Sequence, residues 1–296
     1  MTHRAAKRYH TELLLLLSPY LLGTLLLIGL PALLTFGLAF FQYDALSAPR
    51  WVGLWNFQDI FGDPLLGVAL RNSLYFIFLA VPLQVLLALA LALLLNQRRR
   101  GTGFYRVAVY LPTVIPDVAY ALIALWIFNP LYGPLNLILH GLGLPAPDWL
   151  IDPNTAKLVF VIMSLFQIGE AFVILLIGLQ DVPTEVTAAA AVDGSSTWQT
   201  LRHITLPLLL PWVVLVSFRA VILSFSWTFT PAMIMTKGDP YYATLFMPLL
   251  VYEEAFDRFR YGSGAAMMLL VVAVTFYFVS TIYLLFRNSG YADEPA

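Results

Sequence analysis

Charged side chains are scarce in this sequence, and cysteine is absent. Only 11% of the 296 residues are Asp, Glu, Lys or Arg, whereas a soluble domain carries about 25%. A chain of 33.1 kDa with so few charges cannot cover its surface in water, which excludes a soluble enzyme and a disordered chain. The lack of cysteine excludes disulfides, iron–sulfur clusters and thiolate zinc sites. The net charge of −1 argues against a nucleic-acid partner.

Apolar residues, by contrast, make up 60% of the chain, and the mean hydropathy is +0.81. A membrane helix needs about 20 mainly apolar residues, and long apolar runs do not fit barrel strands, which alternate with period two. Six segments are long enough: about 13–41, 73–95, 107–128, 158–179, 208–235 and 265–286. We therefore expect an all-α integral membrane protein in which residues 1–296 form one transmembrane domain of six helices.

The distribution of positive charge predicts the orientation of these spans. Six spans place both termini on one side, and cytoplasmic segments carry the excess of Lys and Arg. With the termini inside, the inner segments hold nine Lys and Arg residues and the outer segments hold six. The run Arg98–Arg100 directly follows a span, where this bias acts most strongly. We expect a multi-pass protein of the cytoplasmic (inner) membrane, surrounded by lipid, with both termini in the cytoplasm.

The connection between the fourth and fifth spans, residues 180–207, is longer than a simple turn requires. We expect two short helices within it. Asp181 is a candidate cap for the first helix, and Gly194 suits a left-handed residue that ends it. Ser195, Ser196 or Thr197 would cap a second helix that runs to about residue 203, and Pro207 would break that helix before span five.

This cytoplasmic loop has the composition of a docking surface. The small side chains of Ala188–Ala191 allow close approach of another protein, while Trp198 adds an apolar anchor and Arg202 a charge. The alternative is a helical loop that folds back on the inner ends of the spans. The residues alone leave these two interpretations open.

The same loop resembles the signature of maltose-type permeases of binding-protein-dependent ABC importers, roughly I-P-x-E-L-x-E-A-A-x-x-D-G-A followed by an aromatic residue and I-T-L-P. The matching positions are Val182, Pro183, Glu185, Ala189, Ala190, Asp193, Gly194, Trp198, Ile204, Thr205, Leu206 and Pro207. The sequence departs from the pattern at Ala188, where the family has a glutamate. Glu185, one helical turn earlier, is the nearest carboxylate that can replace it.

Further segments are similar to the same family in the same order, over roughly residues 12–290. They are Val52–Phe57, Ala69–Ser73, Leu111-Pro112, Trp126–Pro130, Gly178–Gln180 and Thr236–Pro240. The resemblance implies half of a transmembrane pore, of the type of the first of two permeases, with a coupling-helix loop that docks into an ATPase. It also implies a second homologous permease, two ATPase subunits and an extracytoplasmic solute-binding protein. The sequence contains no G-x-x-x-x-G-K-[ST] motif, so no enzyme activity and no bound cofactor are expected in this chain, and ATP and Mg²⁺ would be used by the ATPase.

Three ionisable residues lie within predicted spans: Asp117, Glu170 and Arg219. Counted along straight helices, they lie roughly 15, 13 and 16 Å from the inner ends of their spans, near the bilayer midplane where transporter sites occur. They are candidates for the substrate path, together with Tyr120, Gln167 and Trp227. The alternative is a structural pair of Arg219 with Glu170 or Asp117. His140 and His203 lie apart from carboxylates, so we expect no metal site.

A second group of charges, Glu253, Glu254, Asp257, Arg258 and Arg260, falls in an outer segment. It is either a solvated face or a docking point for the binding protein. The resulting hypothesis is a sugar importer permease, for a di- or oligosaccharide. Import of glycerol phosphate or a polyamine through the same fold, and a proton-coupled carrier, are alternatives. A membrane enzyme would need a clustered nucleophile and base, and the sequence suggests none.

Overall fold

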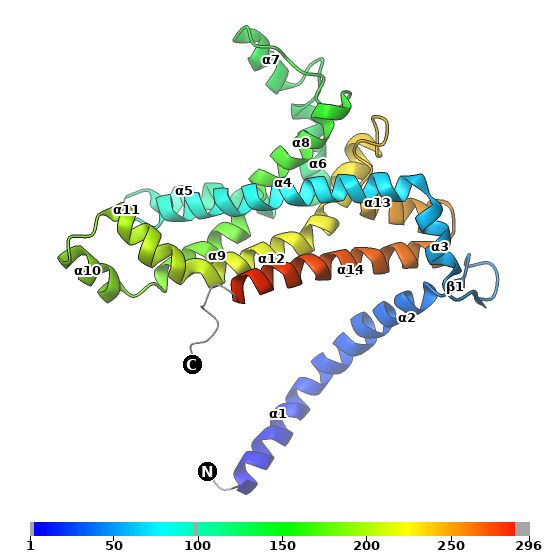
Figure 1. Ribbon diagram of the computed structural model, residues 1–296, viewed down its shortest axis with the longest axis horizontal. Coiled ribbons are helices and arrows are strands. Elements are labelled where there is room, and N and C mark those ends of the chain that lie inside the picture. The colour runs from blue at the N-terminus through cyan, green and yellow to red at the C-terminus, as the bar shows by residue number, and fades with distance from the viewer. Residues whose placement is uncertain (1–2, 98–99, 288–296) are drawn as a thin grey trace. The chain divides into compact units, whose positions relative to one another are not determined.

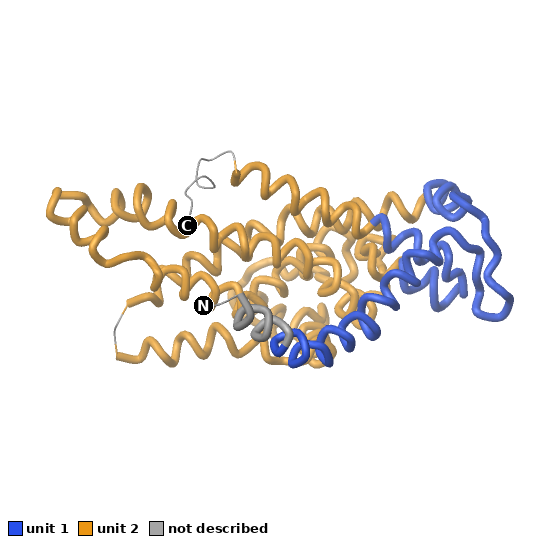
Figure 2. Tube along the Cα trace, turned by 90° about the horizontal axis from the view of Figure 1, so that it is seen from below, with its two compact units in different colours: residues 1–63, 251–270 blue, residues 64–250, 271–296 orange. Residues whose placement is uncertain are grey.

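The computed structural model describes residues 3–97 and 100–287, and the chain divides into two compact units (Figures 1 and 2). Unit 1 comprises residues 1–63 and 251–270, and unit 2 comprises residues 64–250 and 271–296. Arg98 and Arg99, which belong to the run used to orient the spans, lie outside the described residues.

The described part of the chain is mainly helical, and its only strands are two of two residues each, which pair antiparallel: β1 (Phe41–Gln42) and β2 (Arg50–Trp51). Four helical stretches are long and apolar enough to cross a membrane, namely Glu12–Leu38, Pro64–Leu95, Thr197–Thr236 and Tyr261–Phe286. Two bent pairs of helices bring the number to six if each pair is one span. The predicted all-α membrane class is confirmed.

Unit 1 begins with α1 (His3–Thr24), a π-helical turn η1 (Leu25–Gly29) and α2 (Leu30–Leu38), which together form the first span. The strands β1 and β2, α3 (Trp55–Gly62), the π-helical turn η5 (Glu253–Asp257) and the start of α14 (Tyr261–Phe286) complete it. Asn56 is buried and donates to the carbonyl oxygens of Ala39 and Phe41, at 2.8 and 2.9 Å. This amide thereby satisfies backbone groups at the point where the first span ends.

The charged segment of unit 1 is not a uniformly solvated face, because Glu254 is only 1% exposed. Its carboxylate pairs with Arg258 at 3.0 Å and with Arg260 at 2.9 Å, and Arg260 also pairs with Asp59 on α3. A buried carboxylate needs such partners to remain charged. The interpretation as a solvated face is therefore wrong for Glu254, whose ion pairs connect η5 to the start of α14.

In unit 2, α4 (Pro64–Leu95), α9 (Gly169–Gln180) and α12 (Leu206–Pro231) pack against one another (Figure 1). The helix α4 begins nine residues before the predicted second span. Its polar residue Asn72 is buried there, because its amide donates to the carbonyl oxygens of Tyr242 and Leu245. Two short helices, α7 (Pro134–Gly141) and α13 (Met247–Tyr252), and the π-helical turn η4 (Ala232–Thr236) complete the unit.

The predicted third and fourth spans are not straight. Residues 107–128 fall on α5 (Thr102–Tyr110), a 3₁₀ turn η2 (Leu111–Val114) and α6 (Asp117–Ile127), with a bend of 100° between the two arms. Pro116 causes the break, because it forces the residue before it into an extended conformation. Residues 158–179 fall on α8 (Pro153–Phe166) and α9, which are bent by 45° at Gln167 and Ile168.

The loop 180–207 contains the two expected helices, α10 (Thr184–Val192) and α11 (Thr197–Thr200). Gly194 is left-handed with φ of 79°, as the sequence predicts. Of the three candidate caps for the second helix, Ser196 is the one used, and it forms a capping box with Gln199. Asp181 instead ends α9, and Pro183 occupies the N-cap of α10, so the predicted cap is wrong. The predicted break at Pro207 is also wrong.

The second loop helix continues into span five as one helical stretch, Thr197–Thr236. A π-helical turn η3 (Leu201–Thr205) precedes Pro207, which lies in the first turn of α12. At the change from π to α hydrogen bonding the regular backbone pattern is interrupted. The missing N–H of Pro207 therefore costs little stability at this position. One continuous helix therefore carries residues of the loop 180–207 and residues of the fifth span.

Candidate functional site

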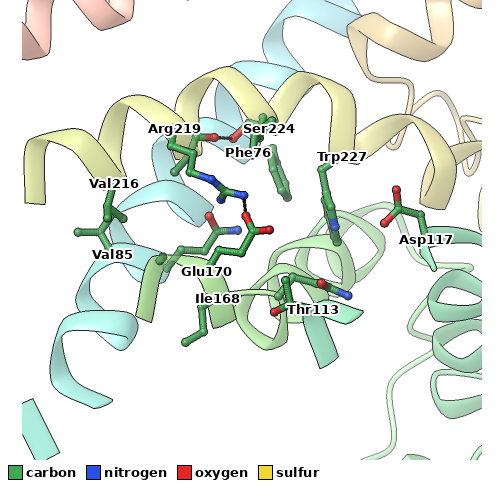
Figure 3. A pocket seen from close by; sticks show the side chains of 15 residues that line it. Phe76, Val85, Thr113, Asp117, Ile168, Glu170, Val216, Arg219, Ser224 and Trp227 are labelled. Carbon is green, nitrogen blue, oxygen red and sulfur yellow. Dashed lines mark hydrogen bonds and ion pairs between the residues drawn. The ribbon is translucent and has the colours of Figure 1, made fainter. Parts of the chain in front are cut away.

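The breaks in the third and fourth spans meet at a pocket of about 190 Å³ within unit 2 (Figure 3). Its walls come from α4, η2, the first turn of α6, the start of α9 and the middle of α12. Five of the six predicted path residues line it: Asp117, Gln167, Glu170, Arg219 and Trp227. Residues far apart in sequence are thus brought together by the two broken spans.

An ion pair joins the two helices that flank this pocket. The guanidinium of Arg219 on α12 contacts the carboxylate of Glu170 on α9 (Figure 3). The side chains are 38% and 43% exposed in this single chain, so both remain accessible from the cavity. Of the two partners that the sequence offers for Arg219, Glu170 rather than Asp117 forms the ion pair.

Asp117 is the first residue of α6 and lies on the opposite side of Trp227 from the ion pair (Figure 3). Within the described residues its carboxylate has no hydrogen-bond or ion-pair partner. The free N–H groups at a helix N-terminus favour a negative charge, and both Asp117 and Glu170 lie in first turns. The depth counted along a straight third span does not hold for Asp117, because the 100° bend precedes it.

Two hydrogen bonds hold the breaks together. The side-chain amide of Gln167 donates to the carbonyl oxygen of Pro112 at 3.1 Å, and the backbone N–H of Gly169 donates to the hydroxyl of Thr113 at 3.0 Å. The second contact requires glycine, because a Cβ at residue 169 would lie 2.3 Å from the Thr113 hydroxyl and 2.9 Å from the Tyr110 Cα. At each break, a side chain therefore forms a hydrogen bond with a backbone group of the other break.

Aromatic faces complete the pocket. Trp227 stacks on Phe76 of α4, with ring centroids 5.6 Å apart and planes 12° apart. Tyr120 does not line the pocket, since its hydroxyl donates to the carbonyl oxygen of Met163 at 2.7 Å within a neighbouring apolar cluster. The sequence places Tyr120 near the path, but only the rotation of α6 after the bend determines where it points.

Phe76, Gln84 and Thr113 also line the pocket, and sequence reasoning missed them. Gln84 carries a usable signal, because an amide inside the apolar run of the second span is a polar residue that needs a partner. Its amide nitrogen lies 3.4 Å from the carbonyl oxygen of Ser164. Phe76 and Thr113 carry no such signal, since phenylalanine and threonine are common throughout membrane helices.

The predicted docking residues lie at the end of unit 2 where α9 ends and the Thr197–Thr236 helix begins (Figure 1). Most of them are exposed: Glu185, Ala188, Ala189, Asp193, Gly194, Trp198 and Arg202. Ala190 is buried. Trp198 is 63% exposed.

A bundle of apolar helices around a polar, ion-paired pocket defines a polytopic membrane transport protein. Residues 84–289 match the family of the binding-protein-dependent transport system inner membrane component, and the chain belongs to this family. The resemblance noted in the sequence is thereby confirmed, and the chain is a permease component of such a system.

Relatives and solved structures agree with this membership. The chain is 34% identical over 285 residues to a probable ABC transporter permease, YesP of Bacillus subtilis, which covers 93% of this chain and 89% of the relative. It is 30% identical over 273 residues to the trehalose/maltose permease MalF of Thermococcus litoralis, with 91% of both chains covered. A bacterial alginate ABC transporter, solved in complex with an alginate pentasaccharide-bound periplasmic protein, shares the fold with a TM-score of 0.82, 19% identity and 96% coverage of both chains.

Proposed function

We propose that this chain forms part of the translocation path of an ATP-driven importer for a saccharide, most specifically a di- or oligosaccharide. The observation that carries this proposal is the stacked pair of Phe76 and Trp227 beside the unpaired carboxylate of Asp117. Sugars present an apolar ring face and a rim of hydroxyls, and these groups match an aromatic face and a planar acceptor. The trehalose/maltose relative supports the same class of solute.

The charge of the pocket favours a neutral solute over an anion such as glycerol phosphate. Arg219 is the cation of the pocket lining, and Glu170 already neutralises it. Asp117 then leaves the lining with one uncompensated negative charge, which opposes an anionic solute. The same charge suits a cation, so a polyamine is the second candidate, to be tested beside the sugars.

The partners follow from the family and the exposed loop. In this proposal a second homologous permease completes the pore, and two ATPase subunits use ATP and Mg²⁺ on the cytoplasmic side, where both termini lie. An extracytoplasmic binding protein delivers the solute. The α10 helix and the exposed Trp198 support docking of an ATPase at residues 180–207.

Reconstitution in proteoliposomes tests the function. We expect uptake of a neutral saccharide that requires the partner permease, the ATPase, internal ATP and the binding protein together. Glycerol phosphate and spermidine, each with its own candidate binding protein, serve as the competing solutes. Uptake by this chain alone on a proton gradient would overturn the proposal, and ATP-driven uptake of spermidine without any sugar would replace the solute class.

Replacing Trp198 by Ala is expected to weaken ATPase association about 30-fold, because an interface aromatic anchor contributes roughly 2 kcal/mol. The exposed indole makes little contribution to the fold, so the melting temperature of the purified permease should stay unchanged. Co-purification of the ATPase and uptake-coupled ATP hydrolysis measure the effect. Phe276→Ala, a truncation of an aromatic ring that is 72% exposed on α14, is the matched control. Equal retention of the ATPase by both variants would contradict docking through Trp198.

A further inference from the structure

A second and larger cavity, of about 610 Å³, lies wholly within unit 1. Its walls are the segment from β1 to β2, the helix α3 and the turn between η5 and α14. We call this cavity the outer groove. The β1–β2 segment and α3 follow the first span, and the turn between η5 and α14 follows the fifth span. These walls therefore lie on the side of the membrane opposite to the loop 180–207, which follows the fourth span. Small-molecule sites commonly have volumes of about 300–1,000 Å³, so the outer groove is large enough for sugar rings.

Three aromatic residues from three segments line the outer groove: Tyr43, Trp55 and Phe259. Trp55 is 47% exposed and Phe259 is 55% exposed, so their ring faces remain uncovered in this chain. Phe259 has a left-handed backbone with φ of 57°, which a bulky residue rarely adopts. Its neighbours Arg258 and Arg260 both pair with the buried Glu254, and these ion pairs hold the turn that presents the phenyl ring.

The charges of the outer groove are balanced, and most are already engaged. Arg260 is used by Asp59, by Glu254 and by the hydroxyl of Ser263. Asp44 accepts at one oxygen from the amides of Leu46 and Ser47 and from the Ser47 hydroxyl. The Ser47 bonds, followed by that from Leu46, hold the pKa of Asp44 below its ordinary value, so this carboxylate stays charged at neutral pH.

Three polar groups of the lining have no hydrogen-bond partner within the described residues: the amide of Gln42, the hydroxyl of Tyr43 and the guanidinium of Arg50. Together they offer several donors and two acceptors around the aromatic faces. With Asp44 and Asp59 set against Arg50 and Arg260, the lining carries no net charge. This combination favours a neutral ligand rich in hydroxyls.

We propose that the outer groove is a binding subsite for a neutral saccharide, separate from the pocket at the broken spans. The inference rests on the proposed function for the class of solute, but not on the pocket residues. Asn56, bonded to the carbonyl oxygens of Ala39 and Phe41, holds the groove wall in place before any ligand arrives. A concave, preorganised and charge-balanced surface is typical of a small-molecule site. A protein loop docked in the same groove is the competing occupant, and the test separates the two.

The test uses the assembled transporter in lipid nanodiscs without its binding protein. Trehalose, maltose and maltotriose are titrated, with trigalacturonate as the anionic comparison, and binding is followed by calorimetry. We expect the wild type to bind at least one neutral sugar, and the double variant Trp55→Ala, Phe259→Ala to lose affinity by about tenfold or more. Phe61→Ala, on the same helix α3 and 66% exposed but outside the groove lining, should bind as the wild type does.

Three outcomes would overturn the proposal: no panel sugar binds the wild type, the double variant binds the sugars as well as the wild type, or the double variant keeps its sugar affinity and, when the binding protein is added back, fails only to bind that protein. The third result would assign the groove to protein docking. Arg50→Ala provides a second variant if the double variant fails to fold, because Arg50 is exposed and has no partner within the described residues. Failure of the proposed function is distinguishable, since it would appear as absent saccharide uptake by the wild type in proteoliposomes, whatever the titration shows.

Discussion

Replacing Glu170 by Gln is expected to reduce the folded, transport-competent protein by roughly 60- to 300-fold. The substitution leaves the charge of Arg219 without its partner inside a membrane span. An uncompensated arginine at the centre of a membrane helix costs about 2.5–3.5 kcal/mol, and each 1.4 kcal/mol is a factor of ten. Fluorescence-detected size exclusion and uptake in proteoliposomes measure the two consequences, folding and transport.

Paired substitutions separate a structural role of this ion pair from a role in solute binding. Glu170→Gln combined with Arg219→Gln removes both charges, so neither side chain is left as an uncompensated charge in the span. We expect this double variant to recover folding but not uptake if the pair contacts the solute. The reversed pair, Glu170→Arg with Arg219→Glu, should rescue only partly, because it places a cation in the first turn of α9. Full uptake by the neutral double variant would assign the pair to structure alone.

The sequence is sufficient to predict the elements governed by local composition. The apolar runs locate all six spans, because about 20 apolar residues are needed whatever the neighbours are. The predicted last residues lie within three residues of the observed ends, whereas most observed spans begin 4 to 11 residues before the predicted start. The early start of α4 is one example, because Asn72 tolerates burial only through bonds to Tyr242 and Leu245, about 170 residues away. Local chemistry likewise predicts the left-handed Gly194, and it narrows the cap of the second loop helix to Ser195, Ser196 or Thr197, of which Ser196 is the cap.

The breaks and continuities of the helices depend on information that sequence composition does not contain. Pro116 interrupts a helix, whereas Pro207 does not, because a π-helical turn accommodates the second proline. No proline marks the break at Gln167 and Ile168. Gly169 follows it directly, but a single glycine does not specify a bend, and tertiary bonds to η2 hold this one in place. Composition alone therefore predicts six apolar segments but not the angles within them.

For the candidate site, too, the sequence predicts some features and leaves others to the tertiary structure. The sequence predicts that Asp117, Glu170 and Arg219 are costly in a membrane and belong together, since each ionisable residue in a span needs a partner or a function. It does not select the partner of Arg219, because that choice depends on the bends that place α6 and α9. Tyr120 is excluded from the pocket for the same reason, since the orientation of α6 directs its hydroxyl to Met163.

The junction of the two breaks gives the last prediction. Gly169→Ala is expected to destabilise the protein by about 1–3 kcal/mol, the usual cost of overpacking a tight contact. The added Cβ would lie 2.3 Å from the Thr113 hydroxyl and 2.9 Å from the Cα of Tyr110, so α9 must move away from η2. Thermal denaturation in nanodiscs measures the loss of stability, and uptake should fall with it because Glu170 is the next residue along the helix.

The same Gly→Ala substitution at a second helical position separates the effect of the contact at residue 169 from the effect of helix propensity. Gly67 lies in α4, and a Cβ added there would meet no atom within 4 Å, so Gly67→Ala should stabilise the helix by up to about 1 kcal/mol. The same chemical change then has opposite signs at the two positions. Adding Thr113→Ala to Gly169→Ala should restore only part of the loss, because the backbone of Tyr110 remains in the way. Equal melting temperatures for the Gly67 and Gly169 variants would show that the two breaks are not in contact, and the pocket between them would then lack its rigid wall.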